Sequence, residues 1–98
     1  MVFWIYILRC ADRSYYTGHT DELERRIAEH QSGEIDGFTS SRRPVQLVYS
    51  QEFAGREEAL AVELQIKRWS RAKKEALIRG DWGALKLAAK KNFKKPSR

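Results

Sequence analysis

The sequence predicts an α+β fold in the order β-β-α-β-α-α-α, with one small antiparallel or mixed sheet and helices on its faces. Three patterns predict it. Residues 2–9 are apolar at nearly every position, residues 45–53 alternate in polarity, and residues 56–69 repeat apolar side chains at helical spacing. With 98 residues and 42% hydrophobic content, the chain fits one globular domain, placed at residues 1–90, with a basic flexible tail at residues 91–98.

The first two strands are expected to form a hairpin. The segment from Val2 to Arg9 is rich in β-branched and aromatic residues, as is typical of a central strand buried on both faces. A short aromatic run from Tyr15 to His19 follows after a turn cluster. Arg13 stands where a tight hairpin favours glycine, so we expect a longer or bulged loop.

The helices have recognisable ends. Asp21 is expected to be the N-cap of the first helix, with Glu24 completing a capping box and Gly33 lying just beyond the last turn. The third strand and the helix at residues 56–69 come next. Ser70 is expected to cap a further helix that ends near Gly80, and a last helical piece follows it.

Charge is divided unevenly along the chain. Residues 1–66 hold seven Lys/Arg and eleven Asp/Glu, whereas residues 67–98 hold twelve Lys/Arg and two Asp/Glu. A basic last third of this kind indicates a surface for a polyanion, above all nucleic acid. The alternative is a solvated basic helix followed by a frayed lysine-rich end.

The apolar run at the start of the chain and the single cysteine bear on membrane association and on the cellular compartment. The longest apolar run, from Val2 to Leu8, is too short to span a membrane and lacks the flanks of a signal peptide. The single cysteine, Cys10, excludes an internal disulfide and a cysteine-based zinc site. We therefore expect a protein of the reducing cytoplasm.

Two tyrosines ten residues apart, Tyr6 and Tyr16, are the first candidates for chemistry. They share a face of the sheet only if the hairpin register allows it, and their hydroxyls would then lie opposite Arg26 and Glu63. A phenol near a cation can act as a base towards water. The alternative is that both are core aromatics whose hydroxyls find partners at the sheet edge.

Arg26 and His30 lie four residues apart, and therefore on one face of the first helix. A guanidinium matches the geometry and charge of phosphate, and an imidazole can orient water or move a proton. The alternative is a surface arginine and a histidine that interacts with the helix C-terminus.

Glu63 interrupts the apolar stripe of its helix between Ala59 and Ile66. Burying a carboxylate there is unfavourable unless it is paired or holds a cation, and one carboxylate with water ligands is a common way to bind magnesium. The alternative is an ion pair with Arg26 or Lys67.

Further basic residues are candidates for contacts with a nucleic-acid backbone rather than with bases. Trp69 and Trp82, which lie among them, are expected to pack in the core. The candidate contacts are His19, Arg26, Arg42, Arg43, Lys67, Arg68 and Arg71.

Taken in order and at these spacings, five segments resemble the GIY-YIG nuclease family. More narrowly, the chain is similar to the small stand-alone bacterial members, which resemble the N-terminal catalytic domain of the excision-repair endonuclease. Trp4 replaces the glycine of the motif, Thr17 replaces its isoleucine, and His19 stands where many relatives place a lysine. The segments are residues 6–12, 16–18, 23–26 with 29–30, 43–45 and 63–67.

The resemblance implies a three-stranded antiparallel sheet flanked by helices and phosphodiester hydrolysis with one Mg²⁺ or Mn²⁺ ion. By the same resemblance, Tyr6 or Tyr16 is the general base or positions the water. Arg26 binds the scissile phosphate, His30 assists proton transfer or the leaving group, and Glu63 holds the metal.

The function predicted in this way is a metal-dependent endonuclease acting on DNA, and less so on RNA, in repair or in processing of structured DNA. A protein partner is one possible source of targeting. Two alternatives remain. One is a nucleic-acid-binding module with weak or no catalytic activity, and the other is a structural or partner-recruiting domain with a vestigial site.

Overall fold

The computed structural model describes residues 2–35, 37–81 and 83. It contains two compact units, residues 1–67 and residues 68–98, which are considered separately. The predicted helix after residue 81 and the predicted tail at residues 91–98 lie outside the described residues, Gly83 apart. The elements are β1 (Phe3–Arg9), β2 (Tyr15–Thr20), α1 (Leu23–Ser32), β3 (Gln46–Phe53) and α2 (Arg56–Lys67) in the first unit, and α3 (Arg71–Arg79) in the second.

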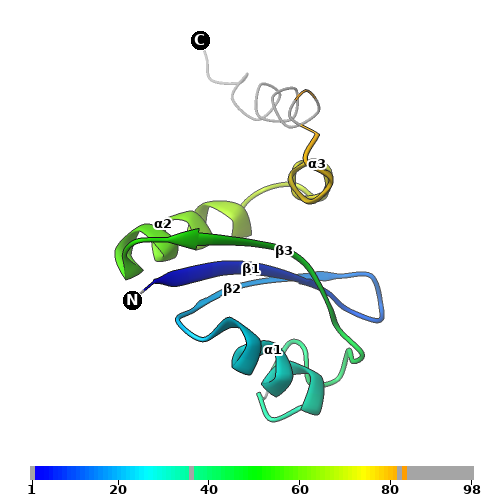
Figure 1. Ribbon diagram of the computed structural model, residues 1–98. Helices are drawn as coiled ribbons and strands as arrows, with labels where there is room; N and C mark the ends of the chain where they lie inside the picture. Colours follow the sequence, from blue (N-terminus) through cyan, green and yellow to red (C-terminus); the bar gives the residue numbers. More distant parts are fainter. Residues whose placement is uncertain (1, 36, 82, 84–98) are drawn as a thin grey trace. The chain divides into compact units, whose positions relative to one another are not determined.

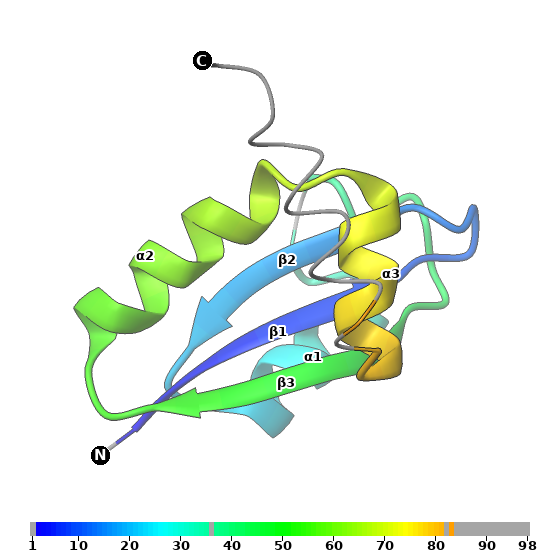
Figure 2. The same cartoon turned by 90° about the horizontal axis from the view of Figure 1, so that it is seen from above.

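The first unit is built on a three-stranded antiparallel sheet in the order β2-β1-β3, as predicted. The central position of β1 is confirmed by its middle residues, Ile5 to Leu8, which are at most 1% exposed. Helices α1 and α2 cover opposite faces of the sheet (Figure 1), and the view from above shows α2 running nearly along the direction of the strands, on the β2 side (Figure 2). The α+β class is therefore confirmed.

The two faces of the sheet bury different side chains. On the α1 face, Tyr6, Leu8, Cys10 and Val45 form a cluster, against which the half-buried residues Tyr16, Leu23 and Ile27 pack. On the α2 face lie Ile5 and Ile7, and the buried residues of α2 are Ala59, Glu63 and Ile66. Each fully buried aliphatic side chain contributes about 1.5–3 kcal/mol.

A five-residue loop, residues 10–14, joins β1 to β2, which confirms the expectation of a longer hairpin connection. The Cys10 amide donates to the Ser14 carbonyl at 2.8 Å, and the Arg13 amide donates to the Cys10 carbonyl at 2.9 Å. Arg13 has a left-handed backbone with φ 72°. Glycine adopts that conformation without strain, whereas arginine does not.

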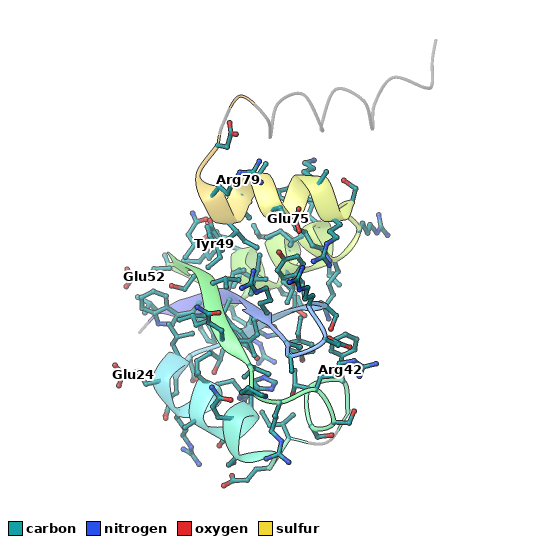
Figure 3. The ribbon with its side chains drawn as sticks, turned by 90° about the vertical axis from the view of Figure 1, so that its right-hand side faces the viewer. Glu24, Arg42, Tyr49, Glu52, Glu75 and Arg79 are labelled. Atoms are coloured by element: carbon teal, nitrogen blue, oxygen red, sulfur yellow. The ribbon has the colours of Figure 1, made fainter. Side chains whose placement is uncertain are left out.

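A β-bulge in β3 changes the face that its residues occupy. Ile7 pairs with Tyr49 but Leu8 pairs with Leu47, so one residue of β3 has no partner on β1. Leu47 therefore faces the α1 side of the sheet. Tyr49 faces the α2 side (Figure 3). The predicted alternation had placed both residues on one face, and the bulge makes that prediction wrong.

The ends of α1 confirm one prediction and correct another. Gly33 ends the helix in a left-handed conformation, φ 84°. The Gly33 amide donates to the His30 carbonyl, and the Glu34 amide donates to the Glu29 carbonyl. The predicted capping box is wrong, because the N-cap is Glu22 and no side chain caps the helix. Instead, the Thr20 hydroxyl at the end of β2 accepts a hydrogen bond from the Glu22 amide at 3.1 Å.

In the second unit, Ser70 caps α3 as predicted, since its hydroxyl accepts from the Lys73 amide at 3.2 Å. Gly80 ends the helix with φ 70°. The preceding helix, α2, stops at Lys67, two residues earlier than expected. No helix in the described part of the chain is long and apolar enough to cross a bilayer.

Candidate active site

The hairpin register places Tyr6 and Tyr16 on the same face of the sheet. Tyr6 pairs with Gly18 and Leu8 pairs with Tyr16, so both tyrosines project towards α1. Their ring centroids are 6.3 Å apart. This is the arrangement that the interpretation of the two tyrosines as a functional pair requires.

Gly18 makes room for the Tyr6 phenol. A Cβ atom added at Gly18 would lie 2.6 Å from the Tyr6 hydroxyl oxygen, closer than side chains approach one another. The phenol therefore lies across the backbone of β2, where only glycine leaves space. The requirement is steric, since the backbone of Gly18 does not have the positive φ that favours glycine.

A buried hydrogen-bonded chain joins three elements on this face. The Tyr6 hydroxyl lies 2.9 Å from His30 Nε2, and His30 Nδ1 lies 2.7 Å from the Thr39 hydroxyl. All three side chains are at most 1% exposed. Burial, with the charge of Arg26 as a second cause, lowers the pKa of His30, so the imidazole is neutral at pH 7 and has one donor and one acceptor.

The donor and acceptor in each hydrogen bond between Tyr6, His30 and Thr39 follow from the partners of Tyr6. Arg26 lies beside the phenol and interacts with it by charge and by a hydrogen bond, and guanidinium groups only donate. A phenol that accepts from Arg26 is best satisfied by donating to His30 Nε2, because a phenol is a stronger donor than an alkyl hydroxyl. His30 then carries its proton on Nδ1 and donates it to Thr39.

Tyr6 is held in its neutral form. Burial is the main reason that its pKa is raised, the neighbouring Tyr16 and Glu63 act in the same direction, and Arg26 opposes them. A phenol with a raised pKa and an engaged proton is poorly suited to take a proton from water.

Tyr16 differs from Tyr6 in exposure and in its partners. It is half-buried, and its ring contacts the rings of His30, at 5.1 Å between centroids, and Phe38, at 6.0 Å and 28° between planes. Among the described residues its hydroxyl has no hydrogen-bond partner. The oxygen is therefore available to a water or a substrate.

Arg26 lies at the border of the α1 face with its side chain 41% exposed. Its Nε is 3.3 Å from the Glu29 carboxylate, which also pairs with Arg25 at 3.2 Å. A shallow cavity of about 260 Å³ opens here, lined in part by Thr20, Arg25, Arg26 and Glu29. Arg26 can thus reach both the Tyr6 phenol and solvent.

Glu63 approaches the sheet from the opposite face. It is 6% exposed, as its place in the apolar stripe predicted. Its Oε1 contacts His19 Nδ1, and its Oε2 lies 2.8 Å from Lys67 Nζ. His19 pairs with Ile5 and so projects towards α2.

The expectation that the tyrosine hydroxyls face Glu63 directly is therefore wrong, because α2 covers the other side of the sheet. Residues on the two faces nevertheless interact electrostatically. Glu63 contributes to the raised pKa of Tyr6. The pKa of Lys67 is raised mainly by its hydrogen bond to Glu63 and, to a smaller extent, by Tyr16.

Glu63 fits a hard divalent cation as a single protein ligand. The described residues contain no group of three or more His, Cys, Asp or Glu side chains placed to hold a metal ion. Magnesium, however, commonly binds through one or two carboxylates and keeps several waters. A buried carboxylate with a basic side chain on each oxygen is compensated by positive charge, and a cation that takes the place of Lys67 or His19 preserves that compensation.

The two loop arginines predicted as phosphate contacts both bind the protein itself. Arg42 pairs with Asp12 at 3.0 Å, donates to the Phe38 carbonyl at 2.7 Å and stacks 4.1 Å above the Phe38 ring; it lies on the loop after α1 (Figure 3). Arg43 donates to the carbonyls of Ser40, at 3.0 Å, and Gln31. Their contact with nucleic acid stays a prediction.

The remaining basic candidates fall in both units. Lys67 ends α2 and pairs with Glu63. Arg68 and Arg71 belong to the second unit, where Arg71 Nε lies 3.0 Å from Glu75. The structure brings together Tyr6, Tyr16, Arg26 and His30 on one face and His19, Glu63 and Lys67 on the other.

Sequence reasoning missed Thr39, Gly18 and Phe38 as parts of the site. Gly18 could have been found, because glycine inside a strand often marks a close approach. Thr39 and Phe38 lie in a loop without periodicity, and nothing local indicates that they reach His30 and Tyr16.

Residues 2–76 match the model of the GIY-YIG catalytic domain. The chain belongs to the GIY-YIG family.

Its relatives include UPF0213 proteins. One from Natronomonas pharaonis is 45% identical over 80 residues, which cover 82% of this chain and 94% of that protein. One from Staphylococcus saprophyticus is 48% identical over 75 residues, which cover 76% of this chain and 92% of that protein.

Two solved structures are also similar. The solution NMR structure of a UPF0213 protein from Bacillus halodurans has a TM-score of 0.55 and 40% identity, covering 92% of this chain and 96% of that one. The solution NMR structure of a protein from E. faecalis has a TM-score of 0.58 and 36% identity, covering 82% and 85%.

Proposed function

We propose that the protein is a metal-dependent endonuclease that hydrolyses phosphodiester bonds in DNA, in repair or processing of structured DNA in the cytoplasm. Membership of the GIY-YIG family supports the nuclease class. The observation that carries the proposal is the placement of Tyr16, whose hydroxyl has no hydrogen-bond partner among the described residues, beside Tyr6 on the α1 face. Arg26 interacts with Tyr6 on that face, and a buried, cation-compensated Glu63 lies on the α2 side.

In this proposal Arg26 binds the scissile phosphate. Its guanidinium presents a planar fork with a permanent charge, it is partly exposed beside a cavity, and Glu29 fixes one side of it. As the attacking oxygen bonds to phosphorus, negative charge builds up on the phosphoryl oxygens, and a fixed guanidinium stabilises it.

Tyr16 acts as the general base. It takes a proton from the attacking water through its phenolate oxygen, the water oxygen bonds to phosphorus, the phosphorus–oxygen bond to the leaving group breaks, and the leaving oxygen is protonated by solvent. Positive charge lies near the tyrosine pair, since Arg26 interacts electrostatically with Tyr6 and Lys67 with Tyr16.

Tyr6 and His30 position the site in this scheme. Both nitrogens of His30 are engaged and the ring is buried, so we assign it to orienting the Tyr6 phenol. Tyr6 in turn holds Arg26. Glu63 would hold one Mg²⁺ or Mn²⁺ ion, which supplies Lewis-acid stabilisation of charge on the phosphate.

The second candidate function is a nucleic-acid-binding module with weak or no catalysis. The observation that favours it is the complete pairing of Glu63 by His19 and Lys67. A pure binder has no requirement for a divalent ion, whereas the proposed nuclease does.

The two functions are separated by a cleavage screen over single-stranded, duplex, nicked and branched DNA and a structured RNA, in Mg²⁺, in Mn²⁺ and in chelator. The nuclease proposal predicts metal-dependent cleavage of at least one DNA substrate, lost in Tyr16→Phe. Binding to these substrates without any cleavage would favour the binding module.

A further inference from the structure

We propose that Arg9 and Arg13 form a second phosphate-binding site. This site binds the nucleic-acid backbone at a point distant from the scissile phosphate. Both residues line one cavity of about 290 Å³ at the end of the β1–β2 hairpin, together with Pro44 and Gln46. Its occupant is a nucleic-acid strand, so the inference rests on the proposed function. Arg9 ends β1, about 10 Å along the strand from Tyr6.

The first observation behind this inference is that the two arginines are unpaired. In the described part of the chain neither guanidinium has an ion-pair or hydrogen-bond partner, whereas Arg25, Arg26 and Arg42 each contact a carboxylate. Two guanidinium groups on one cavity repel each other unless an anion lies between them, and phosphate matches their bidentate geometry.

The second observation is that no acidic residue lines this cavity. Asp12 belongs to the same loop, but its carboxylate accepts from the Ser14 amide at 3.0 Å, from the Ser14 hydroxyl and from Arg42 Nε at 3.0 Å. These partners lower the pKa of Asp12 and hold the charge outside the cavity. The two guanidinium groups are therefore the charged groups that line the cavity, and no lining carboxylate offsets them.

The third observation is the backbone of Arg13. Its φ of 72° lies in the left-handed region, which glycine adopts freely and arginine does not. Strained backbone positions concentrate at functional sites, where the side chain they present serves a purpose beyond folding. An unpaired arginine at a position that suits glycine is consistent with such a purpose.

The test compares Arg13→Gly and Arg9→Gln with a matched control, Arg56→Gln. Arg56 is the exposed first residue of α2 and follows β3, whose last residue pairs with Phe3, so it lies at the other end of the sheet from Arg9. Each variant removes one positive charge. Affinity for a fluorescein-labelled duplex oligonucleotide is measured by anisotropy in chelator over a series of salt concentrations, and Tm is measured in parallel.

We expect Arg9→Gln and Arg13→Gly each to reduce the slope of log K against log salt by about 0.9, for one phosphate contact on duplex DNA. Arg13→Gly should weaken binding while its Tm stays equal to or above the wild-type value, because the glycine relieves strain. Wild-type slopes in both variants, or an equal loss in Arg56→Gln, would overturn the site.

Failure of this site and failure of the nuclease proposal give different results. If the chain binds DNA but does not cleave it, the arginine variants still lower the slope while no metal restores cleavage. If the chain is a nuclease without this second site, wild type cleaves in Mg²⁺ and the arginine variants bind with unchanged slopes.

Discussion

The two faces of the sheet hold their polar groups in opposite ways. On the α1 face, Tyr6, His30 and Thr39 form a buried chain of neutral groups. On the α2 face, Glu63 is a buried charge compensated by His19 and Lys67. Neutral groups joined by hydrogen bonds are fixed in one geometry, because each donor needs its acceptor. A buried carboxylate needs only a neighbouring positive charge, so a metal ion can replace a basic side chain beside it. We therefore propose that the α1 face positions the reacting groups and that the α2 face binds a cation.

The largest expected effect comes from removing the charge on the α2 face. Glu63→Gln keeps the shape of the side chain, and we expect it to reduce cleavage about 10³-fold or more, because the metal loses its protein ligand. Folding, followed by circular dichroism, and DNA affinity should stay near wild type. Cleavage at the wild-type rate by this variant would show that Glu63 does not hold the metal.

Replacing each tyrosine on the α1 face by phenylalanine distinguishes the general base from the positioning residue. Tyr16→Phe should lower the single-turnover rate about 10²–10⁴-fold with little change in stability, because its hydroxyl has no hydrogen-bond partner among the residues that the structure describes. Tyr6→Phe should instead lower the free energy of unfolding by about 1–3 kcal/mol, since it leaves His30 Nε2 unpaired. The assignment is reversed if Tyr6→Phe is the slower enzyme and Tyr16→Phe the less stable protein.

A methyl group at Gly18 tests whether the phenol of Tyr6 needs the space above β2. Gly18→Ala places a Cβ atom 2.6 Å from the Tyr6 hydroxyl and should displace the phenol from His30, lowering the free energy of unfolding by about 1–3 kcal/mol. Urea unfolding measures the change. A fully stable Gly18→Ala would mean that the phenol has room elsewhere.

Thr39 should determine which nitrogen of His30 carries the proton. Thr39→Val removes the acceptor of the Nδ1 proton, and we expect a loss of stability of about 1–3 kcal/mol and a shift of the ring ¹⁵N signals away from the Nδ1-protonated pattern. Thr39→Ser keeps the hydroxyl and should restore both. An unchanged tautomer in Thr39→Val would remove Thr39 from the chain.

The smallest effect is a dependence of stability on pH that belongs to His30. Because burial lowers its folded-state pKa below about 6.5, the unfolded chain binds more protons, and the free energy of unfolding falls as the pH drops below that value. Urea unfolding at pH 7.5 and at pH 5.5 measures it. His30→Gln should reduce the difference, whereas His19→Gln, which removes the other imidazole, should retain the part due to His30.

Much of the sheet and of the site could be predicted because the information is local. The continuous apolar run marked β1 as central, Arg13 indicated a long hairpin loop, and the break in the apolar stripe identified Glu63. The bulge that moves Tyr49 to the other face could not be predicted, since it depends on pairing with β1 and not on the alternation within β3.

Contacts between distant segments were also out of reach. His19 and Glu63 are 44 residues apart and His30 reaches into an irregular loop, so neither pair follows from a local pattern. The predicted cap at Asp21 was wrong because α1 begins at Leu23 with Glu22 as its N-cap, so Asp21 lies before the cap position. Sequence periodicity assigns residues to faces, whereas packing decides which partners meet there.

The most direct test of the contrast between the two faces is a Mn²⁺ titration followed by NMR. Paramagnetic broadening should appear first at the amides of Glu63 and His19 in the wild-type protein and should be absent there in Glu63→Gln, while the ring nitrogens of His30 keep their pattern. Broadening that is equal in wild type and Glu63→Gln, or that is centred on His30, would contradict the assignment of the cation to the α2 face.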